Sequence, residues 1–350
     1  MKQIFLHIGS HKTGSSSIQE ALLAQQSVLH RQNFHYFDIK GPSGKHGHPN
    51  DWVMTDDVHS GHAHVLALDK LRRYCEDVDQ TNIIFSNEML SWIFRESRIA
   101  HIRQALLGFN VKIIVYIRRQ DKQMVSHHQQ GSKGMNPAMS YYASLPTALP
   151  SQGFHRYLNY FEKLSMWADV FGEENMIIRL FEPESFEKGD VVQDFCQQLG
   201  VEGIKGVRVN TSNGFEKTKV GHLINQTLPK SELACLLRSG LSNQGKLLPS
   251  RAEAKQLYQR YIYSNQKLNA RFNLSSQFDD VFNPDFSCYP DIAGDQWDED
   301  SANLAIKRLL TVLAPLAEST WFNFILKCYR YRLRFLHRTM AKRQADVNTP

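Results

Sequence analysis

Four short runs of apolar residues stand out in the first half of the chain, at residues 4–8, 82–85, 111–117 and 176–180. Uninterrupted apolar runs of this length are typical of parallel strands that are buried on both faces. Segments with helical spacing follow them, at residues 16–30, 88–107, 120–130 and 190–199. This alternation predicts an α/β fold of three layers, in which helices cover both faces of a central parallel sheet.

Two polar stretches, residues 40–61 and 131–153, interrupt the alternation. Long loops that rise from the strand ends of such a fold usually form the walls of a substrate site. Residues 210–290 have the pattern of helices and loops, and the chain is helical and increasingly basic from residue 300 onward. We therefore predict one main domain over residues 1–290 and a helical, basic extension over residues 291–350.

The extension contains an apolar stretch at residues 309–326, which Pro315, Glu318 and Asn323 interrupt. A spanning helix needs about 20 predominantly apolar residues, so we predict a buried or surface-lying helix instead. Its aromatic and basic residues suit peripheral contact with a membrane, but also a packed terminal helix with a solvated basic face. We favour the packed helix and leave membrane contact as the alternative.

Composition narrows the class of protein further. Hydrophobic residues make up 42% of the chain and charged residues 22%, which is typical of a folded protein. The net charge of +6 suits an anionic ligand, and no basic stripe interleaved with aromatic residues indicates a nucleic-acid partner. Five scattered cysteines without a CxxC pair indicate a reducing compartment, and the first apolar stretch is shorter and becomes polar sooner than we expect of a signal peptide. We predict a cytoplasmic protein, either free or bound peripherally at the inner face of the membrane.

The first predicted strand leads into a glycine-containing turn and a helix, over residues 7–17. Backbone N–H groups at the start of a helix point at an anion, and the helix dipole adds favourable potential. Gly9 and Gly14 allow the turn to close tightly, and Ser16 with Gln19 fits a capping box that would start the helix. The segment is therefore predicted to bind phosphate.

The loop differs from the P-loop of nucleotide-binding proteins in one respect. Gly9 and Gly14 have the P-loop separation, but Ser15 occupies the place of the usual lysine, and Lys12 stands before the second glycine. Among the residues that follow the other strands, only Glu88 suits magnesium, whereas Arg118 suits a second anion. A divergent P-loop kinase or nucleotidase that uses ATP and Mg²⁺ remains the alternative function.

Residues 11–19 resemble the 5′-phosphosulfate loop of sulfotransferases that use 3′-phosphoadenosine 5′-phosphosulfate (PAPS), in the form common in the bacterial branch. The strand that ends at Arg118, with Ser126 eight residues later, resembles the family's 3′-phosphate site. Residues 167–200 also resemble this branch, through Trp167, Phe171, Gly172, Arg179, Asp194 and Phe195. The likeness covers residues 1–290. The chain departs from the family in two places: Gln120 follows Arg119, and no late Arg-Lys-Gly loop is recognisable, for which the segment from Asn213 and Gly214 to Lys217 is the candidate substitute.

The resemblance implies in-line transfer of a sulfuryl group from PAPS to a hydroxyl, with adenosine 3′,5′-bisphosphate (PAP) as the product and no metal. It implies a carbohydrate acceptor, either a polysaccharide or a glycolipid. Lys12 would stabilise the leaving phosphate, and Glu88 would take the proton of the acceptor. The predicted donor-binding residues are His11, Lys12, Thr13, Gly14, Ser15, Ser16, Ser17, Arg118 and Ser126.

Several alternatives stay open for these residues. Glu88 fits the first turn of the next helix equally well as a cap, and His7, His11, His127 and His128 are rival bases. Arg118 can instead form a surface ion pair with Asp121. A dense group of histidines has spacings that can ligate zinc, but without nearby cysteines we favour a metal-free loop near the acceptor. These histidines are His46, His48, His59, His62 and His64.

Overall fold

The computed structural model describes most of the chain and all of the predicted strands. The described residues are 1–37, 68–133, 152–182, 186–206, 213–228, 231–294 and 296–332, residues 147 and 184, and the backbone of 53–55 and 63–65. The predicted loop at 40–61 apart from the backbone of 53–55, most of the loop at 131–153, the histidine side chains between 46 and 64, and the basic residues after 332 lie outside this description.

A five-stranded parallel sheet in the order β2-β5-β1-β6-β7 forms the centre of the fold. Its register sets Gln3 of β1 beside Asn82 of β5 and Asn110 of β6. The four predicted strands are confirmed, and the short β2 is an addition that the sequence did not reveal. The strands are β1 (Gln3–His7), β2 (Phe34–Tyr36), β5 (Asn82–Ser86), β6 (Asn110–Ile117) and β7 (Met176–Leu180), with a separate antiparallel pair, β3 (Val53–Thr55) and β4 (Ala63–Val65).

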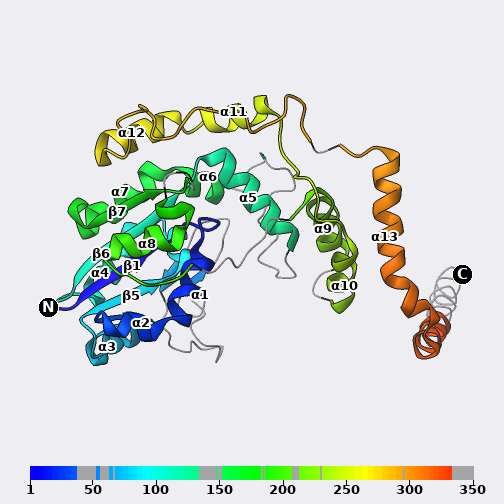
Figure 1. Ribbon diagram of the computed structural model, residues 1–350, viewed down its shortest axis with the longest axis horizontal. Helices are drawn as coiled ribbons and strands as arrows, with labels where there is room; N and C mark the ends of the chain where they lie inside the picture. The colour runs from blue at the N-terminus through cyan, green and yellow to red at the C-terminus, as the bar shows by residue number, and fades with distance from the viewer. Residues whose placement is uncertain are drawn as a thin grey trace, which may run out of the picture.

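Helices cover both faces of the sheet (Figure 1). Alternate residues of the strands enter two separate cores, one on each face. Ile4 and Leu6 of β1 point into the larger core, and Phe5 between them points into the smaller one. Helices on the larger core are α3 (Leu68–Asp77), α4 (Glu96–Ala105), α6 (Gln152–Leu158), α7 (Tyr160–Phe171), α11 (Arg251–Gln259) and α12 (Ile262–Phe272). Helices on the smaller core are α1 (Ser15–Ala24), α2 (Gln26–Arg31) and α8 (Val191–Leu199). The predicted three-layer α/β architecture is confirmed.

Two of the predicted helices are each divided. Residues 16–30 form α1 and α2 with a break at Gln25, and residues 88–107 form the 3₁₀ helix η2 (Glu88–Trp92) followed by α4. The prediction for α8 is confirmed, because the Asp190 side chain accepts the amide of Val192 and Gly200 ends the helix at a φ of 72°. Two further 3₁₀ turns are η4 (Glu173–Asn175) and η6 (Glu187–Gly189).

Part of the segment that resembles the bacterial sulfotransferases lies in this core. Asp194 is buried, and its carboxylate accepts hydrogen bonds from the Arg179 guanidinium and, at 2.6 Å, from the Tyr116 hydroxyl. Arg179 and Asp194 therefore tie β7 to α8, since a buried carboxylate needs such partners.

The later part of the chain adds three helices that pack against one another, the first of them on α5 (Gln120–Lys133). They are α9 (Phe215–Thr227), α10 (Glu232–Gly240) and α13 (Glu299–Glu318). Val220, Leu237 and Ala305 form a small core between them, and α9 packs on α5. The proposed boundary at residue 290 stays a prediction.

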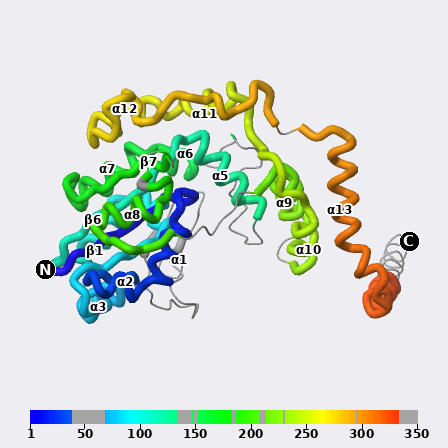
Figure 2. Tube along the Cα trace, in the orientation of Figure 1, coloured from blue at the N-terminus to red at the C-terminus, as the bar shows by residue number. Residues whose placement is uncertain are grey.

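Beyond α13 the chain turns by 94° into a last described helix, Thr320–Arg332, which lies far from the sheet (Figure 2). Within the described residues, no single helix meets the length and hydropathy expected of a membrane span. Only α13 and Thr320–Arg332 taken together meet it, by length and composition. Large apolar side chains of this last helix are exposed. The favoured expectation of a packed terminal helix is therefore wrong for these residues.

Candidate active site

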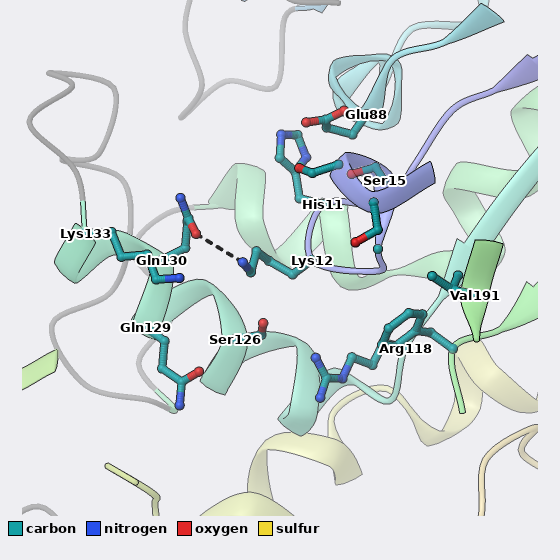
Figure 3. Close-up of a pocket in the computed structure, with 14 residues that line it drawn as sticks. His11, Lys12, Ser15, Glu88, Arg118, Ser126, Gln129, Gln130, Lys133 and Val191 are labelled. Carbon is teal, nitrogen blue, oxygen red and sulfur yellow. Dashed lines mark hydrogen bonds between the residues drawn. The ribbon is translucent and has the colours of Figure 1, made fainter. Parts of the chain in front are cut away.

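The carboxyl ends of the three central strands meet at one pocket (Figure 3). β1 leads into the loop that carries Lys12, β5 leads to Glu88, and β6 leads to Arg118. Ligands of open parallel sheets bind at this edge. The pocket has a volume of about 470 Å³, and its lining residues are His11, Lys12, Gly14, Ser15, Ser16, Ser17, Glu88, Arg118, Ser126, Gln129, Gln130, Lys133, Phe181 and Val191.

One side of the pocket, which we call the loop wall, is formed by residues 9–17. Gly9 has a φ of 98°, and a Cβ atom on it would lie 2.9 Å from Cα of Glu88. Gly14 has a φ of 83°, and a Cβ atom there would lie 2.7 Å from Val191 Cγ1. Both positions therefore require glycine, for backbone conformation and for space.

Hydrogen bonds fix the backbone of the loop wall, some with residues outside the loop and one between two residues of the loop. The His11 amide donates to the Tyr157 hydroxyl at 2.9 Å, and Gln123 Nε2 donates to the His11 carbonyl at 2.6 Å. Thr13 is buried, and its hydroxyl donates to the Ser10 carbonyl at 2.6 Å. Thr13 can therefore meet a ligand only through its backbone, and its role in donor binding stays a prediction.

The start of α1 differs from the predicted capping box. The helix begins at Ser15, its N-cap is Gly14 in the left-handed conformation, and no side chain caps it. Gln19 instead donates through Nε2 to Glu88 Oε2 at 2.9 Å. The first-turn amides of an uncapped helix lack intrahelical partners, so this end of α1 can bind an anion.

Lys12 crosses the pocket from the loop wall toward α5. Its Nζ atom donates to Gln130 Oε1 at 3.0 Å. Burial, with Lys133 and Arg118 nearby, lowers the pKa of Lys12 to about 8, although the Glu88 carboxylate acts in the opposite direction. A bound anion would reverse this effect, because it stabilises the charged amine.

The opposite side of the pocket, which we call the helix wall, consists of Arg118 and one face of α5. Ser126, Gln129, Gln130 and Lys133 are three and four residues apart, so they share a face of the helix. Ser126 was predicted from its spacing after Arg118, whereas the other three residues were not predicted. The repeated polar spacing after Arg118 was the signal that could have revealed them.

Arg118 faces this pocket rather than forming the alternative ion pair with Asp121. Asp121 is buried and pairs with Arg119, with Arg119 Nε 2.7 Å from Oδ1 and Nη2 2.9 Å from Oδ2. The Arg118 Cζ atom lies 5.5 Å from the centre of the Phe181 ring. Burial lowers the pKa of Arg118, and an anion in the pocket would offset that unfavourable burial.

Glu88 is the first residue of η2, but the cap of this helix is Asn87, whose side chain accepts the Met89 amide at 2.9 Å. Asn87 therefore provides the side-chain cap, and Glu88 lies in the first turn of the helix, as the alternative expected. The Glu88 carboxylate lies at the pocket beside His11 (Figure 3). It can accept a proton from a hydroxyl that is bound there.

The rival histidines are less suited to be the base. His11 Nδ1 accepts a hydrogen bond from Trp92 Nε1 at 3.3 Å, so neutral His11 carries its proton on Nε2 and acts as a donor. Burial lowers the pKa of His11 to about 4, which keeps the ring neutral near pH 7. His7, His127 and His128 are buried and are not among the residues that line the pocket.

A second compartment of about 360 Å³ adjoins the first. The two share Arg118, Ser126, Gln129 and Phe181. The second adds Lys122 from α5 and, from later in the chain, Lys246, Leu248 and Tyr289. Arg118 and Ser126 thus stand at the junction between two spaces.

The described residues contain no group of three or more His, Cys, Asp or Glu side chains that could hold a metal ion. Among the described residues that line the first compartment, Glu88 is the only acidic one. Metal-free chemistry stays a prediction for the whole chain.

Comparison with known proteins gives only partial matches. No family model matches the chain. An uncharacterized protein from Archaeoglobus fulgidus is 30% identical over 122 residues, which make up 33% of this chain and 31% of that protein. The chain thus spans about a third of that relative's length.

Two solved structures are similar at low identity. A sulfotransferase from Alicyclobacillus acidocaldarius is 15% identical with a TM-score of 0.43, over 78% of this chain and 96% of the other. A mouse sulfotransferase, SULT7A1 complexed with PAP, is 14% identical with a TM-score of 0.27, over 93% and 88% of the two chains. Likenesses of this size establish no family for the chain.

Proposed function

We propose that this chain is a PAPS-dependent sulfotransferase, similar to the bacterial branch, that transfers a sulfuryl group to a hydroxyl. One observation carries the proposal: two separate anion-binding walls face each other across one pocket. The loop wall offers Lys12 and the uncapped start of α1, and the helix wall offers Arg118 and Ser126. PAPS carries two separate anionic groups, a 5′-phosphosulfate and a 3′-phosphate, so each wall would hold one of them.

The adjoining compartment supports the same ligand, because it provides a place for the nucleoside. Arg118 and Ser126 stand at the junction, where the ribose and its 3′-phosphate would lie if the adenine occupied the second compartment and the 5′-phosphosulfate the first. Lys246 brings a positive charge to this compartment from late in the chain. It is our candidate for the role that the missing Arg-Lys-Gly loop has in the family.

In the proposed reaction, the acceptor oxygen forms a bond to sulfur while the bond from sulfur to the bridging phosphate oxygen breaks. Glu88 takes the proton of the acceptor hydroxyl, and Gln19 holds the Glu88 carboxylate through its 2.9 Å hydrogen bond. Lys12 and the first amides of α1 stabilise the negative charge that forms on PAP. His11 Nε2–H donates a further hydrogen bond in the pocket.

We extend the proposal to a carbohydrate acceptor, as a polysaccharide or a glycolipid. Among its described lining residues, the pocket is mostly polar, with the amides of Gln129 and Gln130 and three serine hydroxyls on the loop wall. Those groups that the donor leaves unpaired, such as the Gln129 amide, can pair with the hydroxyls of a sugar, whereas a purely apolar acceptor would leave them unsatisfied.

The test is calorimetric titration with PAP, with and without Mg²⁺, on the wild-type protein and on Arg118→Ala. We expect metal-independent binding that Arg118→Ala weakens by about 10- to 100-fold, since a hydrogen bond to a charged group is lost. Arg31→Ala, which removes an exposed arginine at the end of α2, is the matched control.

Absence of PAP binding to the wild-type protein would overturn the proposal. Tight binding of ATP that requires Mg²⁺ would favour the kinase or nucleotidase instead. Unchanged PAP binding by Arg118→Ala would remove Arg118 from the 3′-phosphate site.

A further inference from the structure

The last described helix, Thr320–Arg332, exposes an unusual number of large apolar side chains. Trp321 is 69% exposed, Phe324 58% and Tyr331 71%, and Ile325, Leu326 and Tyr329 are exposed as well. Aromatic side chains gain most from leaving water, and a contiguous exposed group of them marks an interaction surface. This helix therefore has the chemistry of a contact surface.

The charge on the same helix has a single sign. Lys327, Arg330 and Arg332 are exposed, and no Asp or Glu occurs between residues 319 and 332. The sequence that follows has one acidic residue, Asp346, and four basic ones, Arg334, Arg338, Lys342 and Arg343. Aromatic side chains combined with positive charge suit the boundary between the headgroups and acyl chains of an anionic lipid surface.

The preceding helix, α13, packs against the rest of the fold. Ala305 of α13 is buried against α9 and α10, with Leu309 and Leu313 packed beside it. A Cβ atom on Gly240 of α10 would lie 2.2 Å from Val312 Cγ2, so the two helices approach closely. The Arg308 guanidinium also pairs with the Glu216 carboxylate of α9. α13 thus holds the last helix away from the sheet (Figure 1).

A second copy of the chain is a less suitable occupant of this surface. In a symmetric dimer the same patch meets itself, which would bring Lys327, Arg330 and Arg332 close to their own counterparts. Like charges at an interface oppose such pairing. Anionic headgroups would instead neutralise them.

We propose that helix Thr320–Arg332 binds the surface of anionic membranes, with Trp321 and Phe324 inserted among the lipids and the basic residues on the headgroups. This assignment does not depend on the transferase activity. If both hold, the helix brings the pocket close to lipid-linked acceptors.

The experiment measures how the full chain partitions onto vesicles of phosphatidylcholine, with and without phosphatidylglycerol, by sedimentation. We expect strong binding only with the anionic lipid. Replacing Lys327, Arg330 and Arg332 with glutamine should weaken it by about 100-fold, at about tenfold or less per charge. Trp321→Ser with Phe324→Ser should weaken it by at least about tenfold.

The matched control is Tyr263→Ser on α12, because Tyr263 is 69% exposed, as Trp321 is. It should leave vesicle binding unchanged. All variants should keep the wild-type thermal unfolding transition, which shows that they fold and keeps this test independent of PAP binding and of the transferase.

Equal wild-type binding to both kinds of vesicle, or none to either, would overturn the proposal. So would light scattering that shows a dimer which the Trp321 and Phe324 substitutions dissociate, because the helix would then be an interface between copies.

Discussion

The loop wall and the helix wall of the pocket are built in different ways. The loop wall is fixed by its backbone: Gly9, Lys12 and Gly14 have positive φ angles, and the His11 backbone donates a hydrogen bond to Tyr157 and accepts one from Gln123. The helix wall offers side chains from one face of α5, together with Arg118. A rigid set of dipoles is suited to charge that appears during a reaction, whereas side chains are suited to holding a ligand.

We therefore expect the two walls to control different quantities, the rate of sulfuryl transfer and the affinity for PAP. Substitutions at the loop wall and at Glu88, which contacts it, should change the rate of transfer more than PAP binding. Substitutions on the helix wall should change PAP binding more than the rate.

Glu88→Gln should have the largest effect, on the rate alone. The amide keeps an oxygen for the hydrogen bond from Gln19 but cannot take a proton. The rate of sulfuryl transfer to a sugar hydroxyl, measured as PAP release from PAPS, should fall by about 10²- to 10⁴-fold. The Kd for PAP should not rise by more than about twofold, since the substitution removes a negative charge from an anion site.

The control for Glu88→Gln is Glu232→Gln, because Glu232 is an exposed glutamate that is likewise the first residue of a helix. An unchanged transfer rate in Glu88→Gln would exclude Glu88 as the base.

Lys12→Ala should lower the rate of transfer by about 10²- to 10³-fold, because a positive charge on the leaving phosphate is lost. Its effect on the Kd of PAP should be smaller, since the amides at the start of α1 remain. Lys70→Ala, at an exposed lysine of α3, serves as the control. If Lys12→Ala weakened PAP binding more than it slowed transfer, the loop wall would act on affinity as the helix wall does, and the proposed difference between the walls would be wrong.

The two walls also differ in how well the sequence revealed them. The loop wall is contiguous, so its glycines, serines and Lys12 could be recognised as one segment. Arg118 and Ser126 could be placed together because helical spacing connects them. The hydrogen bond between Lys12 and Gln130 joins residues 118 positions apart, and no local pattern encodes it.

The features that the sequence predicted wrongly or did not predict have one physical cause: they depend on contacts between segments that are far apart in the sequence. Ser16 and Gln19 have capping-box spacing. Gln19 instead donates a hydrogen bond to Glu88, which is 69 positions away in the sequence, and Gly14 is the N-cap of the helix. The three residues of β2 are too few for a periodic signal, and their pairing with β5 defines the strand. The last helix has the composition of a packed element, but the fold holds it away from a core.

The affinity for PAP should depend on pH through Lys12. Its pKa in the empty pocket is about 8, below the usual lysine value, and a bound phosphate raises it. Binding should therefore be constant below this pKa and weaken above it, by up to about tenfold per pH unit, because the amine must then take up a proton. Titrations from about pH 7 to about pH 9.5 would measure this.

Lys12→Arg is the control for the pH profile, because a guanidinium stays charged throughout this range. Its profile should be flat above pH 8. The same decline in Lys12→Arg would assign the titration to another group, such as Lys133, whose pKa is also lowered by burial.

Gln130→Ala should have the smallest effect and should act on affinity. Gln130 Oε1 accepts a hydrogen bond from Lys12 Nζ, which positions the amine before a ligand arrives. Losing it should raise the Kd of PAP by about three- to tenfold, the size expected for one hydrogen bond, with a smaller change in rate. Gln256→Ala on α11 makes the same substitution at an exposed glutamine and should change neither quantity. Tighter PAP binding in Gln130→Ala would show instead that Gln130 competes with the ligand for Lys12, so that the helix wall restrains the loop wall until the donor binds.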